Sequence, residues 1–258
     1  MRAVHSTLGK MAAITAYLVA HPYTSGSELR HLLGEFYNRV CVKRSPIMPV
    51  SLEELGIKGD ADVRVSNFKA TLGNLSADEM LCLISLACAR HPAVVLELGT
   101  FDGNTSLQLA SNLPDAEIYT VDLPVDRDHC AEAARNDNVL VASQRRSHLR
   151  YAHTLQARNI HQVYGNTLEI DFLDACSGKR PDFIFIDAGH SYECVRNDTI
   201  KALAAAAPDA MLVWHDYIHH WPDVYNYLNQ LAVEYMLRRI VGTSLVVLDL
   251  ALNNRERQ

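Results

Sequence analysis

Continuous apolar runs alternate with helix-like stretches along the last two thirds of the chain. Five of these runs predict buried strands, at 93–98, 117–122, 160–164, 182–187 and 210–215. The runs do not alternate with polar residues, which is the pattern of strands that helices cover on both faces. Strands separated by helices predict right-handed crossovers, and so an α/β fold with a doubly wound, mostly parallel sheet.

The two ends of the chain complete this expectation. The segment 236–250 reads as two strands joined by a Gly-Thr-Ser turn, a hairpin that adds an antiparallel strand and brings the sheet to seven strands. Residues 1–75 read as helical pieces broken by turns, and Ser76-Ala-Asp-Glu opens a helix that runs to about Arg90. We therefore expect a helical N-terminal extension at 1–75, acting as a lid or dimerisation surface, and a main domain at 76–258. The segment 125–158 is longer than a crossover needs and predicts a helical insertion near the site.

Composition narrows the class of protein. The 258 residues carry a net charge of −6, which argues against a nucleic-acid partner, because phosphate binding needs a basic face. No apolar run reaches the roughly 18 residues of a membrane span. Six scattered cysteines without a Cys-x-x-Cys pair favour reduced thiols and a cytoplasmic protein.

The end of the first strand carries the most informative motif, Glu97-x-Gly99-x-x-x-Gly103. The glycines let the backbone approach a ligand without a Cβ in the way, and Asn104, Thr105 or Ser106 can cap the following helix. A nicotinamide-binding turn needs Gly-x-Gly-x-x-Gly, but position 101 is Phe and no third glycine occurs. An acidic turn of this spacing fits a ligand that lacks phosphates and carries a cationic amino-acid portion.

Two further strand ends are polar. Asp122 ends the second strand, where a carboxylate can accept hydrogen bonds from both hydroxyls of a ribose. Asn166 and Thr167 follow the third strand and place small polar groups where an adenine edge could lie. In open α/β sheets ligands bind beyond the carboxyl ends of the strands, so these ends belong to one predicted site.

Together these strand ends resemble the class I S-adenosylmethionine-dependent methyltransferases, over roughly 76–250. The resemblance implies a Rossmann-like methyltransferase fold with S-adenosylmethionine as cofactor. By the resemblance Glu97, Gly99 and Gly103 surround the methionine part, Asp122 the ribose, and Asn166 and Thr167 the adenine. The full set of residues expected at the cofactor is Glu97, Gly99, Thr100, Phe101, Gly103, Thr105, Ser106, Asp122, Asn166, Thr167 and Asp187.

The fourth and fifth strands end in carboxylates and imidazoles: Asp187 and His190 after one, His215 and Asp216 after the other. Because adjacent parallel strands end at the same edge, we expect these four side chains to form one rim. They could hold Mg²⁺ or a transition metal. Alternatively, a histidine could remove the proton of a hydroxyl group.

The segment Asp187-x-x-His190-x-Tyr192 resembles the Asp-x-x-Lys-x-Tyr segment of catechol and caffeoyl-coenzyme A type O-methyltransferases, and the Asp-x-x-His-Ser-Tyr-Glu form of bacterial secondary-metabolism relatives. The resemblance implies that Asp187 and His190 are catalytic, with His190 as the base. Metal ligands are then expected at Asp187, His215 and Asp216. His215 departs from the acidic residue that the family has at its position.

The leading hypothesis is therefore methyl transfer from S-adenosylmethionine to a hydroxyl of a small molecule, such as a secondary metabolite, by a homodimer or higher homo-oligomer (EC 2.1.1.-). One alternative is a nicotinamide-dependent oxidoreductase, which the missing glycines disfavour. Another is a non-catalytic cofactor-binding scaffold, which the ionisable groups at the strand ends disfavour.

Overall fold

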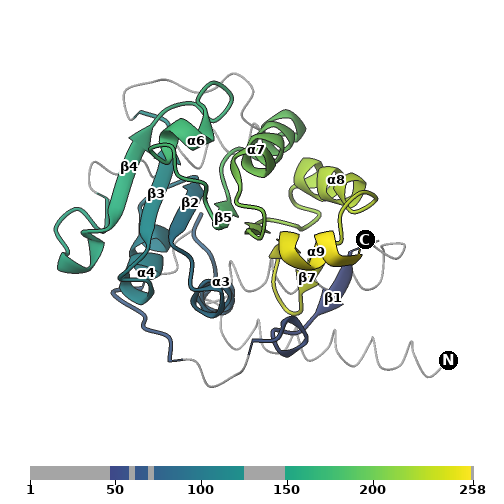
Figure 1. Cartoon of the computed structure of the whole chain (residues 1–258), viewed down its shortest axis with the longest axis horizontal. Coiled ribbons are helices and arrows are strands. Elements are labelled where there is room, and N and C mark those ends of the chain that lie inside the picture. Colours follow the sequence, from purple (N-terminus) through teal and green to yellow (C-terminus); the bar gives the residue numbers. More distant parts are fainter. Residues whose placement is uncertain (1–46, 58–61, 69–72, 125–148, 257–258) are drawn as a thin grey trace, which may run out of the picture. The chain divides into compact units, whose positions relative to one another are not determined.

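The computed structural model describes residues 47–57, 62–68, 73–124 and 149–256 (Figure 1). These residues lie in one of the two compact units of the chain, Ser45–Gln258. The predicted helices at 1–46, and most of the insertion predicted at 125–158, fall outside the described residues and stay predictions. None of the described helices is long and apolar enough to cross a membrane.

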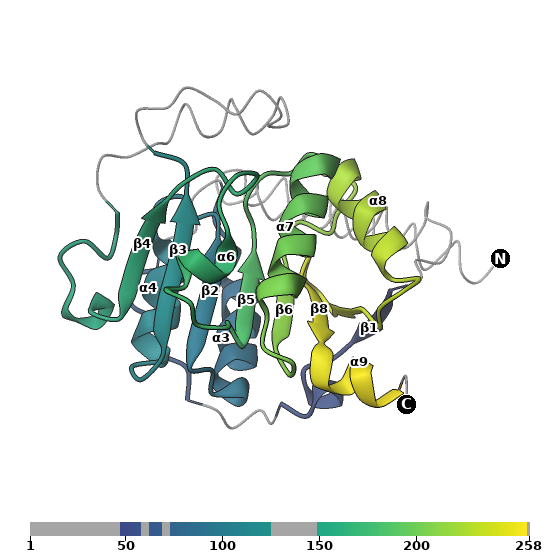
Figure 2. The same ribbon diagram turned by 45° about the horizontal axis from the view of Figure 1, so that its top comes forward.

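The described residues build one eight-stranded sheet in the order β1-β7-β8-β6-β5-β2-β3-β4 (Figure 2). All neighbouring strands pair in parallel except β8, which is antiparallel to both β6 and β7. The strands are β1 (Met48–Val50), β2 (Val94–Leu98), β3 (Glu117–Asp122), β4 (Ile160–Tyr164), β5 (Phe183–Ile186), β6 (Met211–Trp214), β7 (Arg238–Ile240) and β8 (Val246–Asp249). The predicted mostly parallel α/β sheet and its antiparallel strand are confirmed.

The strand at the β7 edge was not expected. β1 contributes an eighth strand where seven were predicted, and it lies within the segment expected to be helical. It is three residues long and contains Pro49, which cannot donate a hydrogen bond to a sheet ladder and is tolerated at an edge. The sheet therefore begins upstream of the predicted boundary at residue 76.

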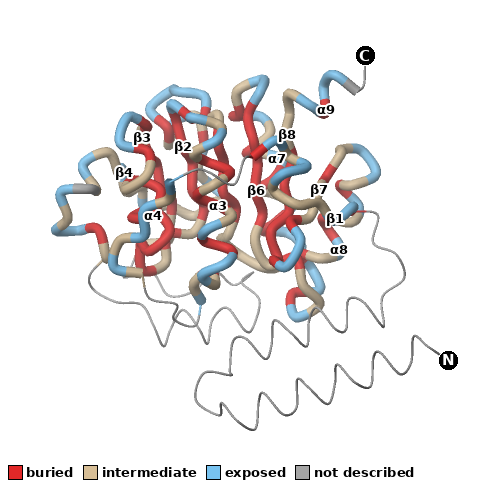
Figure 3. Tube along the Cα trace, turned by 90° about the horizontal axis from the view of Figure 1, so that it is seen from below, coloured by how far each residue is buried: buried red, intermediate tan, exposed pale blue. Residues whose placement is uncertain are grey.

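Helices cover both faces of the sheet and create two hydrophobic cores. On one face α6 (Phe172–Ala175), α7 (Tyr192–Ala205) and α8 (Pro222–Leu231) pack against the strands. On the other face lie α3 (Ala77–Arg90) and α4 (Asn104–Asn112). The central strands β2, β5 and β6 are buried along their length between these layers, as the red tube in Figure 3 shows for β2 and β6. The continuous apolar runs of the sequence are explained by this double coverage.

Helix starts differ in how they are capped. The Ser76 side chain accepts a hydrogen bond from the Glu79 amide, and the Glu79 carboxylate accepts one from the Ser76 amide, as the sequence predicts. The prediction for α4 is wrong: its N-cap is Gly103, in a left-handed conformation, without a side-chain cap. Asp102 partly replaces the cap, because its Oδ1 accepts a bond from the Asn104 amide at 3.1 Å. The short helices η1 (Glu53–Leu55) and η2 (Leu155–Ala157) and the C-terminal α9 (Leu250–Glu256) complete the described fold.

Replacement of Leu96 in the central strand β2 by alanine tests the core. Leu96 is fully buried, so Leu96→Ala leaves a cavity and should lower the free energy of unfolding by about 2–5 kcal/mol. The matched control is Met48→Ala in the edge strand, where the side chain is 60% exposed, and should change it by about 0.5 kcal/mol or less. Denaturant titration measures both; equal effects would contradict the described packing.

Candidate active site

The carboxyl ends of four parallel strands meet at one edge of the sheet. Leu98 at the end of β2 pairs with Val121 of β3 and with Ile186 of β5, and Ile186 pairs with Trp214 of β6. The residues that follow these positions are therefore neighbours in space. They carry the motif after β2, which we call the cofactor turn (residues 97–104), and the four ionisable residues after β5 and β6, which we call the rim.

The glycines of the cofactor turn make room for protein groups. Gly99 has a φ of 99°, and a Cβ placed on it would lie 2.1 Å from the carbonyl oxygen of Asp187. Gly103 has a φ of 76°, and its Cβ would lie 2.6 Å from the ring of Tyr151. In the described structure Gly99 packs against Asp187 and Gly103 against Tyr151, and contact of either glycine with a ligand stays a prediction.

Phe101 and Asp122 join the turn to strand β3. Phe101 adopts a φ of 52°, a left-handed conformation that is unusual for a bulky residue. Its amide donates to Asp122 Oδ2 at 2.8 Å, while the Leu123 amide donates to Asp122 Oδ1 at 2.7 Å. The carboxylate predicted for the ribose is thereby fixed in orientation at the strand end.

Glu97 lies wholly buried beneath the turn. Ser106 Oγ and Thr120 Oγ1 both donate to its Oε2, the latter at 2.5 Å. Burial raises the pKa of Glu97 to about 8, against the lowering effect of these two hydrogen bonds. Among the described residues no hydrogen-bond partner reaches the other oxygen, Oε1.

A layer behind the turn holds it in place, and the sequence analysis missed it. Arg150 donates to Asp102 Oδ2 through Nε at 2.8 Å and to Asn104 Oδ1 through Nη1 at 3.1 Å. Gln162 on β4 donates to Thr100 Oγ1 at 3.1 Å. No local pattern signals these contacts, because they join residues 46 to 62 positions apart in the chain.

Asn166 and Thr167 follow β4 as predicted, and they form a turn of their own. Asn166 Oδ1 accepts from the Leu168 amide at 3.1 Å. The Thr167 carbonyl accepts from Asn197 Nδ2 at 3.0 Å and from Lys201 Nζ at 2.8 Å. Helix α7 thus anchors the segment expected at the adenine.

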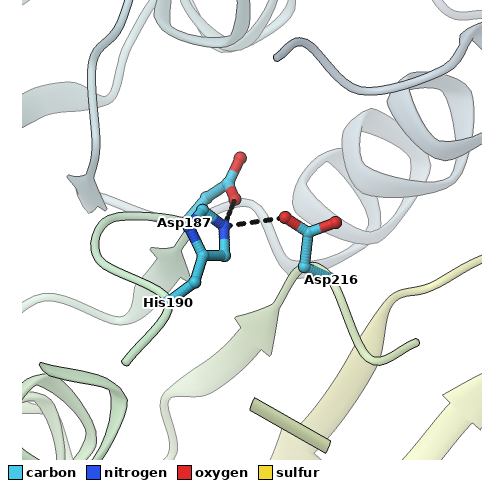
Figure 4. A group of neighbouring side chains, drawn as sticks. All are labelled: Asp187, His190 and Asp216. Carbon is cyan, nitrogen blue, oxygen red and sulfur yellow. Dashed lines mark ion pairs between the residues drawn. The ribbon is translucent and has the colours of Figure 1, made fainter. Parts of the chain in front are cut away.

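The rim brings Asp187, His190 and Asp216 together (Figure 4). His190 Nε2 lies 2.7 Å from Asp216 Oδ2 and 3.9 Å from Asp187 Oδ1. The His190 ring stacks on buried Trp221, with centroids 4.1 Å apart and planes inclined by 17°. One atom from each of the three residues fits within 4.8 Å, so the group has the spacing of a metal site as well as that of a base with its partners.

His215 lies in the rim beside Asp187 and Asp216, as the sequence predicts, and its role as a metal ligand stays a prediction. Its Nδ1 lies 3.0 Å from Asp187 Oδ1, and its Nε2 lies 3.4 Å from Glu79 Oε2. Burial opposes protonation, but the carboxylates of Asp216, Asp187 and Glu79 raise the pKa of His215 well above its ordinary value. With both ring nitrogens facing carboxylates, His215 is an internal cation of the rim.

The two aspartates of the rim differ in environment. Burial raises the pKa of Asp187, even though His215 opposes the shift. The pKa of Asp216 is lowered: burial acts against this, and His215 and His190 outweigh it. Asp216 also has a φ of 61°, a left-handed conformation that aspartate tolerates better than most residues.

Tyr192, the last residue of the Asp-x-x-His-x-Tyr segment, belongs to helix packing. Ser191 caps α7 by accepting from the Cys194 amide at 3.3 Å, and Tyr192 is the first residue of that helix. The Tyr192 hydroxyl donates to Gln230 of α8 at 2.6 Å. The segment thus sets the start of α7 while it presents Asp187 and His190 at the rim.

Comparison with known proteins places this geometry in a class. Residues 96–217, just under half of the chain, match the sequence model of a family described as a methyltransferase domain. The matched range contains the whole cofactor turn and the whole rim. Over this range the sequence is thus similar to that family of methyltransferase domains.

The chain is similar to two solved structures, of which the first supports the fold. The O-methyltransferase TomG from Streptomyces achromogenes, solved with S-adenosylmethionine, is 19% identical, with 84% of this chain and 95% of that chain covered and a TM-score of 0.51. An O-methyltransferase from Bacillus cereus, solved with S-adenosylhomocysteine, is 16% identical over 84% of this chain and 97% of that chain, with a TM-score of 0.46. The first similarity and the family match confirm the predicted resemblance to class I methyltransferases.

Replacement of Glu97 by glutamine tests its buried state in the protein without cofactor. Glu97 keeps its proton up to about pH 8 when folded, but the unfolded chain releases it near the ordinary value of 4.5. The folded state therefore loses stability as pH rises between these values, and the glutamine variant does not. The stability of Glu97→Gln relative to wild type should rise from pH 5 to pH 8, by at most about 1.4 kcal/mol per pH unit.

Denaturant titrations at several pH values measure this difference. Glu193→Gln, at an exposed position of α7, is the matched control. A stability difference that stays constant with pH for Glu97→Gln would show that the buried carboxyl is ionised throughout.

Proposed function

We propose that this chain transfers the methyl group of S-adenosylmethionine to a hydroxyl group of a small molecule. One observation carries the proposal: a single methyltransferase-domain match spans both the cofactor turn and a rim that holds a histidine paired with carboxylates at the same sheet edge. The class of acceptor follows from the histidine, because a hydroxyl must lose its proton as it accepts the methyl group. The O-methyltransferase TomG shares this fold.

The cofactor turn has the chemistry to recognise an amino acid. Glu97 Oε1, an acceptor once the carboxyl is ionised, and Asn104 Nδ2, a donor, are buried and without a hydrogen-bond partner among the described residues. These two atoms complement the ammonium and carboxylate groups of the methionine part of the cofactor. Asp122 is proposed for the ribose. The other predicted contacts remain part of the proposal: Gly99, Thr100, Phe101, Gly103, Thr105, Ser106, Asn166, Thr167 and Asp187.

When bound, S-adenosylmethionine supplies an electrophilic methyl group on a sulfonium. The protein's own contribution is to align the acceptor oxygen and to take up its proton. We assign the proton to the imidazole of His190, whose Nε2 lies 2.7 Å from Asp216. The carboxylates of Asp216 and Asp187 then stabilise the imidazolium, as the acidic member of a catalytic triad does. Stacking on Trp221 keeps the ring in place.

The donor set fits this role better than it fits a magnesium ion. Mg²⁺ prefers six oxygen ligands, whereas the described group offers one oxygen each from Asp187 and Asp216 and a ring nitrogen. The predicted third ligand, His215, has both nitrogens against carboxylates and supplies a positive charge beside Asp187. A second cation there is disfavoured, so we propose that the base acts without a metal.

Calorimetric titration tests the donor, and a base variant tests the reaction. We expect S-adenosylmethionine and S-adenosylhomocysteine to bind with dissociation constants below about 1 mM. His190→Ala should keep this binding and lose methyl transfer by on the order of 10²–10⁴-fold. Transfer of labelled methyl to a panel of small hydroxylated compounds gives the rate. Absence of cofactor binding would overturn the proposal, and full activity of His190→Ala would overturn the assigned base.

Titration with Mg²⁺ and Mn²⁺ tests the metal separately. We expect no calorimetric binding to the wild-type chain below about 1 mM of either ion. Stoichiometric binding that is abolished in Asp216→Asn, a variant that keeps the side-chain shape, would show that the rim is a metal centre.

A further inference from the structure

Glu79 extends the rim by one more charged group, from a helix that precedes the cofactor turn in the chain. It is the third residue of α3 and is only 5% exposed. Its Oε2 lies 3.4 Å from His215 Nε2. His215 in turn lies 3.0 Å from Asp187. The sequence assigned Glu79 only to the start of a helix.

The turn before β8 holds the same carboxylate from another side. Ser244 donates to Glu79 Oε1 through its amide at 2.9 Å and through Oγ at 2.7 Å. Ser244 lies at the rim because β8 begins at Val246, which pairs with Trp214 at the end of β6. The Ser244 hydrogen bonds thus hold the Glu79 carboxylate at Oε1, while its other oxygen, Oε2, faces His215.

Helix capping does not require the charge of Glu79. The Ser76 amide and hydroxyl donate to Glu79 Oε2 at 3.0 and 2.8 Å, and glutamine serves equally well at this position of a capping box. A buried carboxylate costs free energy unless a cation pairs with it. Among the described residues His215 is the cation within reach of Glu79, and the other contacts of this carboxylate are with Ser76 and Ser244.

We propose that Glu79 is a positioning residue for the reaction: it fixes the ring of His215 so that Nδ1 is directed at Asp187, which leaves Asp216 to pair with His190. The inference rests on the proposed function in taking His190 as the base. His215 Nδ1 lies 3.0 Å from Asp187 Oδ1 and 3.6 Å from Asp216 Oδ2, so a small rotation changes which aspartate it holds. Glu79 acts on His190 only indirectly, by determining which of the two aspartates His215 holds.

Glu79→Gln removes the charge and keeps the size and the capping ability of the side chain. The matched control is Ser76→Ala, which weakens the helix cap and keeps the charge opposite His215. Ring ¹⁵N spectra of the full chain, with His190 and His215 assigned by single replacements, report on both imidazoles without any acceptor. We expect Glu79→Gln to shift the resonances of His215 and of His190, and Ser76→Ala to leave both in place.

Two results would overturn the inference. One is unchanged His190 resonances in Glu79→Gln; the other is an equal shift in Ser76→Ala, which would make the role purely structural. If Glu79→Gln does not fold, Glu79→Asp replaces it. Aspartate keeps the charge, but its side chain is one methylene shorter and cannot reach His215 while it caps α3. The resonances of His190 and His215 are then compared in the same way.

Kinetics give a second readout once an acceptor is in hand. We expect Glu79→Gln to lower kcat at least about tenfold and to change KM for S-adenosylmethionine by less than about twofold. Calorimetry with S-adenosylhomocysteine separates the two proposals. If the wild-type chain does not bind S-adenosylhomocysteine, the proposed function is refuted. If it binds and the His190 resonances are unshifted in Glu79→Gln, only the role of Glu79 is refuted.

Discussion

The ion pairs of one partly buried imidazole join three elements at the edge of the sheet. Glu79 lies in α3, Asp187 and Asp216 follow β5 and β6, and all three approach His215. Three carboxylates so close together repel one another, and a cation between them offsets this repulsion. His190 pairs with Asp216 beside this group.

The cofactor turn is organised by the opposite means, through hydrogen bonds to neutral groups and a guanidinium from behind. Arg150 and Gln162 fix its backbone and small side chains, and Asp122 fixes Phe101 in a left-handed conformation. A turn that is already ordered loses little conformational entropy when a ligand binds. In methyl transfer, where alignment accounts for most of the acceleration, such order on one side and a charged rim on the other divide the work between positioning and proton uptake.

The sequence reveals those parts of the fold that depend on local pattern. The five apolar runs and the C-terminal hairpin predict seven of the eight strands of the described sheet, and the Ser76–Glu79 cap is predicted from two residues. β1 is not predicted, because a strand of three residues that includes a proline shows no periodic pattern of apolar and polar residues. For Glu79 the sequence predicts the helix cap but not the contact with His215, because a capping motif does not indicate which other residues approach the carboxylate. Arg150 is invisible for the same reason: its partners are tens of residues away, and only the folded chain brings them together.

The close approach at Gly99 restricts movement of the cofactor turn. The backbone of Gly99 lies against the Asp187 carbonyl with no side chain between them, and a Cβ on Gly99 would clash with the carbonyl oxygen. A turn that moved toward β5 would meet main chain, which cannot rotate aside as a side chain can. The cofactor turn and the Asp187 main chain are therefore in direct contact, so a displacement of the turn toward β5 would also displace Asp187.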